Sequence, residues 1–117
     1  MTQVAYCVEQ LKKLCAIDSP SGFTERAADY LLEELTALGY APKKTRKGGV
    51  AVCLGGEAAD QKEPDGLLLM AHVDTLGAVV QFIKGNGRLR LSPVGGLQAQ
   101  NCEAENCLIY TREGKTY

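Results

Sequence analysis

The strongest constraint on the fold is an apolar run that leads directly into the only histidine of the chain. Leu67–Ala71 is continuous, apolar and of strand length, the pattern typical of a central strand buried on both faces of a sheet. His72 follows, and Asp74 stands two residues later. Because side chains alternate faces along an extended backbone, we expect His72 and Asp74 to point the same way from the end of this strand.

This His-x-Asp spacing is suited to holding a metal ion. A carboxylate that accepts a hydrogen bond from one imidazole nitrogen fixes the tautomer, and the other nitrogen keeps a free lone pair for a divalent metal. A catalytic zinc normally has three protein ligands plus water, whereas this chain contains a single histidine. We therefore expect the 117-residue chain by itself to bind zinc weakly and to be inactive.

Composition excludes several other classes of protein. A net charge of −1 gives no basic surface for nucleic acid, and the longest apolar run is too short to span a membrane. The amino terminus lacks the basic and then apolar pattern of a signal peptide, so a cytoplasmic location is expected. Five cysteines without any Cys-x-x-Cys pair indicate reduced thiols rather than a disulfide framework or a zinc knuckle.

Two helices are predicted in the first third of the chain. Apolar residues recur at helical spacing over Val4–Cys15 and again over Ala27–Leu38. Gly39 occupies the usual position after the end of a helix, and the side chain of Ser21 or Thr24 is expected to cap the start of the second helix.

The remaining chain is predicted to be mainly strands and turns, and no helical period returns after Gly77. Helices that precede a buried strand predict an α/β fold of the sandwich type. Because the last hairpin leaves an edge strand unpaired, we expect these residues to begin a larger protein. The expected elements are an extended segment at Tyr40–Lys44, a strand at Val50–Leu54, a loop at Gly55–Gly66, a hairpin of Ala78–Ile83 with Arg88–Leu91, and a second hairpin of Cys107–Thr111 with Lys115–Tyr117.

Two charged motifs are assigned to solvent rather than to catalysis. Glu33 and Glu34 form an acidic pair, but neighbouring helical residues point about 100 degrees apart and this pair borders the polar face of the helix. The basic run Lys43–Lys47 has no interleaved aromatic residues, so an exposed edge or loop is expected there.

Three motifs together resemble the tetrahedral or glutamyl-aminopeptidase family of co-catalytic di-metal metallopeptidases. They are Ser19–Gly22 before a helix, Ala71–Gly77 around the histidine, and Leu91–Gly96, and they occur in the same order and at similar intervals in that family. The resemblance covers essentially the whole chain, which corresponds to roughly the first third of a family member.

The resemblance implies a fold, a site and an activity. Residues 1–77 would be the N-terminal part of an α/β sandwich metallopeptidase domain, and residues 78–117 the first strands of an inserted β domain. His72 would be a ligand of one of two zinc or cobalt ions, with Asp74 as the catalytic carboxylate that orients it. The complete protein would hydrolyse N-terminal residues from peptides with a di-metal-activated water, and it would be a homo-oligomer.

Two other functions remain open at this point. An amidohydrolase of the aminoacylase or dipeptidase type shares the sequence His-x-Asp-Thr, although Leu91–Gly96 argues against it. A non-catalytic interaction module, in which Val79–Tyr117 pairs its open β edge with another chain, is the second.

Overall fold

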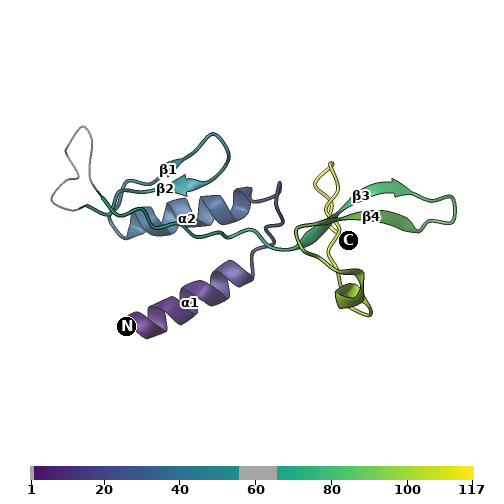
Figure 1. Ribbon diagram of the computed structural model, residues 1–117, viewed down its shortest axis with the longest axis horizontal. Helices are drawn as coiled ribbons and strands as arrows, with labels where there is room; N and C mark the ends of the chain where they lie inside the picture. The colour runs from purple at the N-terminus through teal and green to yellow at the C-terminus, as the bar shows by residue number, and fades with distance from the viewer. Residues whose placement is uncertain (1, 56–65) are drawn as a thin grey trace.

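The computed structural model describes residues 2–55 and 66–117, which contain two helices, two small antiparallel sheets and one short 3-10 helix. Figure 1 shows the two helices and the β1–β2 ribbon at one end of the molecule, and the β3–β4 hairpin with the carboxyl terminus at the other. An extended segment joins the two ends. The predicted α/β class is confirmed at this level.

Both predicted helices are present, as α1 (Gln3–Cys15) and α2 (Glu25–Ala37). Gly39 follows α2 with a positive φ of 90°, the left-handed conformation that glycine adopts without strain. The predicted side-chain cap of α2 is wrong: Thr24 is the N-cap residue, but its hydroxyl makes no capping bond, since its backbone lacks the extended conformation of a capping residue. Neither of these helices is long and apolar enough to cross a membrane.

The contact between α1 and α2 is polar. The hydroxyl of Tyr6 and the amide of Gln10 each donate a hydrogen bond of 2.8 Å to the same carboxylate oxygen of Glu34. Donation to this carboxylate raises the pKa of Tyr6 above 10.0. The prediction of a solvated acidic pair therefore holds for Glu33, which is exposed, and is wrong for Glu34, which is half-buried against α1.

Few side chains in the described part of the chain are buried. The buried residues are Ala27 and Ala28 on α2, together with Ser19. Val4 and Leu11, on the predicted apolar face of α1, are 74% and 61% exposed. The amphipathic pattern thus places α1 correctly as a helix, but most of its apolar face remains in solvent.

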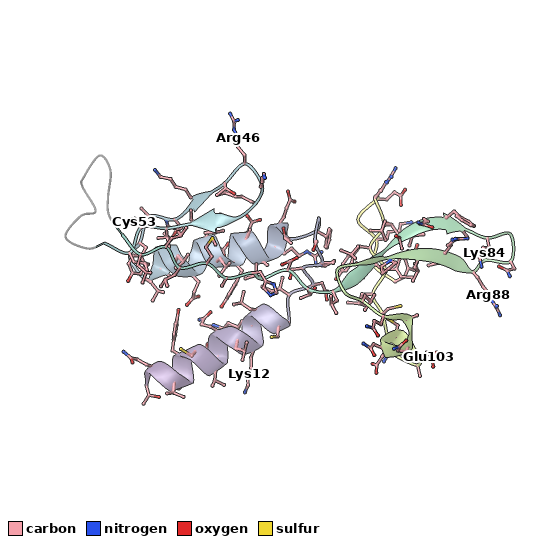
Figure 2. The ribbon with its side chains drawn as sticks, viewed as in Figure 1. Lys12, Arg46, Cys53, Lys84, Arg88 and Glu103 are labelled. Atoms are coloured by element: carbon pink, nitrogen blue, oxygen red, sulfur yellow. The ribbon has the colours of Figure 1, made fainter. Side chains whose placement is uncertain are left out.

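The ribbon next to α2 is shorter than predicted. β1 (Lys43–Lys44) pairs antiparallel with β2 (Val50–Ala51), and the chain turns between them at Thr45–Gly49. The basic run occupies β1 and this turn and is exposed, as predicted. Figure 2 shows Arg46 projecting away from the body of the molecule at the turn. Most of the loop predicted over Gly55–Gly66 lies outside the described residues.

The prediction of a buried strand at Leu67–Ala71 is not met in the structure. This segment is extended but belongs to no strand, and its side chains from Leu67 to Met70 are 73–86% exposed. A β-strand exists through hydrogen bonds to its neighbours, and within residues 2–55 and 66–117 no strand pairs with this segment. The apolar run therefore keeps an extended backbone without a sheet around it.

The first predicted hairpin is confirmed and is the largest sheet described. β3 (Gly77–Ile83) pairs antiparallel with β4 (Leu89–Val94), and the register shifts between Val80 and Phe82, where one extra residue is accommodated. Gly87, at the end of the tight turn, has a φ of 79°. Figure 2 shows Lys84 and Arg88 projecting from this turn.

The second predicted hairpin is also formed. Ile109 and Tyr117 exchange backbone hydrogen bonds of 2.8 and 3.0 Å, and residues 109–117 are named the C-terminal hairpin below. A 3-10 helix, η1 (Ala99–Cys102), precedes it as an element that apolar periodicity did not indicate. All five cysteines are free, as expected from their number and spacing.

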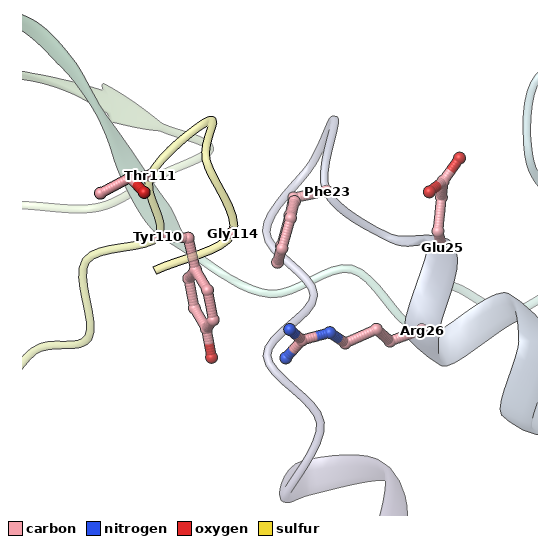
Figure 3. A pocket seen from close by; sticks show the side chains of 6 residues that line it. All are labelled: Phe23, Glu25, Arg26, Tyr110, Thr111 and Gly114. Atoms are coloured by element: carbon pink, nitrogen blue, oxygen red, sulfur yellow. The ribbon is translucent and has the colours of Figure 1, made fainter. Parts of the chain in front are cut away.

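An aromatic and cationic cluster connects the C-terminal hairpin to the start of α2. The guanidinium of Arg26 lies 5.5 Å from the ring centroid of Phe23 and 5.0 Å from that of Tyr110. Figure 3 shows Arg26 reaching toward the two rings, while Glu25 points away from them. These groups line a cavity of about 240 Å³. Stacking of this kind stabilises the contact by about 0.5–1 kcal/mol for an exposed cation.

Candidate metal centre

His72 lies in the extended segment before β3, and its side chain is 85% exposed. Its Nδ1 is 3.1 Å from Oδ1 of Asp74 and 3.2 Å from the backbone carbonyl oxygen of Asp74. An ionised carboxylate and a carbonyl oxygen can only accept, so Nδ1 carries a proton, and in the neutral form of the ring the lone pair is on Nε2. The two side chains therefore meet as their spacing predicts, and the ligand role of His72 stays a prediction.

Asp74 is held from a second side as well. Its other oxygen, Oδ2, accepts a hydrogen bond of 2.5 Å from the hydroxyl of Ser21. This bond, and secondarily the bond from His72, lower the pKa of Asp74 below its ordinary value of 3.8, since both donors favour the charged carboxylate. Asp74 is therefore ionised at neutral pH and uses one oxygen for each partner.

The backbone brings Ser21 and Asp74 together. Ser19 is 1% exposed, and its hydroxyl donates a hydrogen bond of 2.7 Å to the carbonyl of Val73. The amide of Thr75 donates in turn to the carbonyl of Ser19 at 2.8 Å, and Pro20 forms a parallel bridge with Thr75. Two segments more than fifty residues apart in sequence are thus fixed beside each other next to the candidate ligand.

A close approach at Gly77 makes this arrangement possible. A Cβ atom added at Gly77 would lie 2.6 Å from Cβ of Pro20, which is closer than two carbon atoms approach in practice. Only glycine therefore fits at position 77 while Pro20 keeps its place in the bridge. The glycine of the Ala71–Gly77 motif and the proline of the Ser19–Gly22 motif thus meet in the structure.

The described residues fit the part of a metal site that the sequence predicts. A neutral imidazole with Nδ1–H held by a carboxylate is the usual form of a histidine ligand. Over residues 2–55 and 66–117, no group of three or more histidine, cysteine, aspartate or glutamate side chains lies together in a way that could hold a metal ion. The described part of the chain therefore offers no complete coordination sphere, and the role of His72 as one ligand stays a prediction.

Ser19 and Ser21 are the residues whose role sequence reasoning missed. The sequence offers Ser21 only as an alternative to Thr24 for capping α2, and Ser19 only as part of a motif before a helix. The available signal was the order of two short motifs, Ser19–Gly22 and Ala71–Gly77, at an interval shared with a known family. Apolar periodicity carries no information about a contact between two loops, so the contact itself emerges only from the structure.

Comparison with known proteins bears on the identity of the chain. A sequence model of the M42 glutamyl aminopeptidase family matches residues 48–117. This region includes both His72 and Asp74 and accounts for more than half of the chain.

Individual relatives agree with this match. The chain is 37% identical over 117 residues to the protein named "Putative aminopeptidase YhfE" of Bacillus subtilis, an alignment that covers 100% of this chain and 33% of the relative. It is 31% identical over 107 residues to the glutamyl aminopeptidase of Lactococcus lactis, covering 92% and 29%. It is 26% identical over 110 residues to the lysyl aminopeptidase of Pyrococcus furiosus, covering 93% and 30%.

The chain thus spans about a third of the length of the curated relatives that it matches. The match to the family model covers the segment that carries the candidate ligand, and the alignments to relatives extend through the Ser19–Gly22 motif. The chain belongs to the M42 glutamyl aminopeptidase family.

Proposed function

We propose that this chain supplies part of the active site of a metal-dependent aminopeptidase that removes N-terminal residues from peptides. The observation that carries the proposal is the contact of 3.1 Å between Nδ1 of His72 and Oδ1 of Asp74, with the imidazole ring otherwise exposed. The names of the glutamyl and lysyl aminopeptidase relatives support peptides as the substrate class.

In this proposal each of the two residues has a separate task. His72 presents Nε2 as a nitrogen ligand, and Asp74 holds a proton on Nδ1, so that in the neutral ring the lone pair is on Nε2. A bound divalent metal supplies Lewis acidity, which acidifies water and polarises a scissile carbonyl. Asp74 also places a negative charge beside the imidazole, which makes the ring a stronger donor to a cation.

The details of the complete protein belong to the same proposal. We assign residues 1–77 to the N-terminal part of an α/β sandwich catalytic domain and residues 78–117 to the start of an inserted β domain. The position of β3, which begins at Gly77, supports this division. We further propose two zinc or cobalt ions, since both metals accept imidazole nitrogen, and a homo-oligomer as the assembly. Five free cysteines are in keeping with a cytoplasmic location.

The proposal is tested on the protein produced from its complete reading frame. Release of free amino acids from short unmodified peptides is measured before chelation, after chelation, and after return of Zn²⁺ or Co²⁺. We expect chelation to abolish hydrolysis and the returned metal to restore it. A His72→Ala variant should lose activity together with bound metal, and Asp74→Ala should lose about 10- to 100-fold.

Glu33→Gln provides the matched control, because it removes an exposed carboxylate that has no predicted part in the site. This variant should hydrolyse peptides at the rate of the unmodified protein. Full activity in His72→Ala, or full activity after complete removal of metal, would contradict the proposal.

A further inference from the structure

We propose that Ser21 is a positioning residue for His72 and that it acts through Asp74. The inference rests on the proposed function, because the orientation of His72 matters for holding a metal. The carboxylate of Asp74 bridges two donors, Ser21 on Oδ2 at 2.5 Å and His72 on Oδ1 at 3.1 Å. The shorter of the two bonds comes from the serine.

The bond to His72 is not sufficient to hold this carboxylate. The side chain of Asp74 is 41% exposed and that of His72 is 85% exposed, so water competes for the hydrogen bond between them. Exposed pairs of this kind hold one geometry weakly, since each partner keeps its rotamer freedom. A second anchor on the carboxylate is therefore needed to keep Oδ1 directed at Nδ1.

Ser21 fulfils the requirements for that anchor. Its hydroxyl bonds to Asp74 rather than to the amides at the start of α2, although the hydroxyl lies in the turn before that helix. The backbone around it is fixed to the segment of Asp74 by the bridge between Pro20 and Thr75 and by the buried hydroxyl of Ser19. The serine thus reaches Asp74 from a backbone that is attached at the two positions immediately before it.

The expected effect follows from side-chain rotamers. The χ1 torsion of aspartate has three staggered wells, and the bond from Ser21 selects one of them. When this bond is removed and the wells become comparably populated, the fraction of Asp74 that accepts from Nδ1–H falls about three-fold. The ratio of Nδ1–H to Nε2–H tautomers of His72 should fall by up to the same factor, since the backbone carbonyl of Asp74, 3.2 Å from Nδ1, does not depend on this rotamer.

The test uses ¹⁵N NMR of the imidazole nitrogens in the metal-free 117-residue chain. His72 is the only histidine, so its two ring ¹⁵N resonances need no assignment among several residues. The spectra are recorded on the alkaline plateau, where the two ring ¹⁵N shifts no longer change with pH and therefore report the tautomer ratio of the neutral ring. The unmodified chain should show mainly the Nδ1–H form.

Four variants complete the experiment. Ser21→Ala should lower the tautomer ratio by up to about three-fold, Asp74→Asn should lower it at least as far, and Ser21→Thr, which keeps a hydroxyl, should restore it. Ser92→Ala is the matched control, because Ser92 is a half-buried serine of β4 without a side-chain hydrogen bond to Asp74. Amide spectra of α1 and α2 show whether each variant keeps the fold.

The inference is overturned by a predominant Nε2–H form in the unmodified chain, by an unchanged ratio in Ser21→Ala, or by an equal fall in Ser92→Ala. These readouts involve neither metal nor peptide. A failure of the aminopeptidase proposal would therefore appear as absent hydrolysis with a normal response to Ser21→Ala, and the two failures remain distinguishable.

Discussion

Replacing Gly77 with alanine tests whether the close approach to Pro20 holds the candidate site together. The added Cβ would stand 2.6 Å from Cβ of Pro20 and 3.3 Å from its Cγ. The first distance is about 0.8 Å below the shortest ordinary carbon contact of about 3.4 Å. The proline ring is closed and has no rotamer that moves Cβ away, so the backbone of one segment must shift.

The magnitude follows from this forced shift. Overpacking by a single methyl group costs about 1–3 kcal/mol when the surroundings cannot relax. The backbone that must move carries the bond of 2.8 Å from the amide of Thr75 to the carbonyl of Ser19. If the free energy needed to open this contact falls by about 2 kcal/mol, the open state becomes roughly 30-fold more populated, and the Thr75 amide exchanges its hydrogen faster by the same factor.

Amide hydrogen exchange measured by NMR provides the assay. Gly77→Ala should accelerate exchange at Thr75, while the amides in the middle of α2 exchange as before. Gly85→Ala is the matched control, because a Cβ at Gly85 meets nothing within 4 Å and its φ is not positive. Equal protection of the Thr75 amide in Gly77→Ala and in the unmodified chain would refute the reasoning.

Three further predictions concern other parts of the molecule. Donation to Glu34 raises the pKa of Tyr6 in the folded chain above 10.0, so the hydrogen bond stabilises the fold fully below pH 10.0 and loses this effect as the pH rises through the raised pKa. Circular dichroism should show the resulting loss of helix at alkaline pH. The Tyr6→Phe variant should not show this loss. Arg26→Ala removes the stack against Tyr110 and should destabilise the C-terminal hairpin by about 0.5–1 kcal/mol, measured as faster amide exchange there, whereas unchanged exchange would show that the stack contributes nothing. The 117-residue chain should bind Zn²⁺ through His72 with a dissociation constant above about 1 µM in calorimetry, since one imidazole supplies only part of a zinc site, and stoichiometric sub-micromolar binding would contradict this.

Local patterns were sufficient to predict most of the individual elements. The apolar spacing over Val4–Cys15 and Ala27–Leu38 identified α1 and α2, because helical periodicity is a property of the sequence itself. Gly85–Gly87 between two runs of β-forming residues identified the β3–β4 hairpin, since a tight turn needs residues that accept unusual torsion angles.

Elements that depend on partners could not be predicted in the same way. Leu67–Ala71 has the composition of a central strand, yet a strand needs hydrogen-bonding neighbours, and composition does not specify them. Glu34 was assigned to solvent because of its polarity, and the structure places it between Tyr6 and Gln10 of the other helix. In both cases the decisive contacts are tertiary.

The candidate site shows the same division. The contact between His72 and Asp74 follows from the two-residue period of extended backbone, so their spacing was enough to predict it. The contact of Ser21 with Asp74 joins positions 53 residues apart, and nothing in local periodicity indicates it.

The central claim is that His72 offers Nε2 to a metal while Asp74 holds the proton on Nδ1. The most direct measurement is a Zn²⁺ titration of the 117-residue chain, monitored by ¹⁵N NMR of its single imidazole. The zinc concentrations are high enough to populate a weak complex. We expect the Nε2 resonance to shift on binding while Nδ1 remains protonated. A shift centred on Nδ1, or no response of either nitrogen at saturating zinc, would contradict the account.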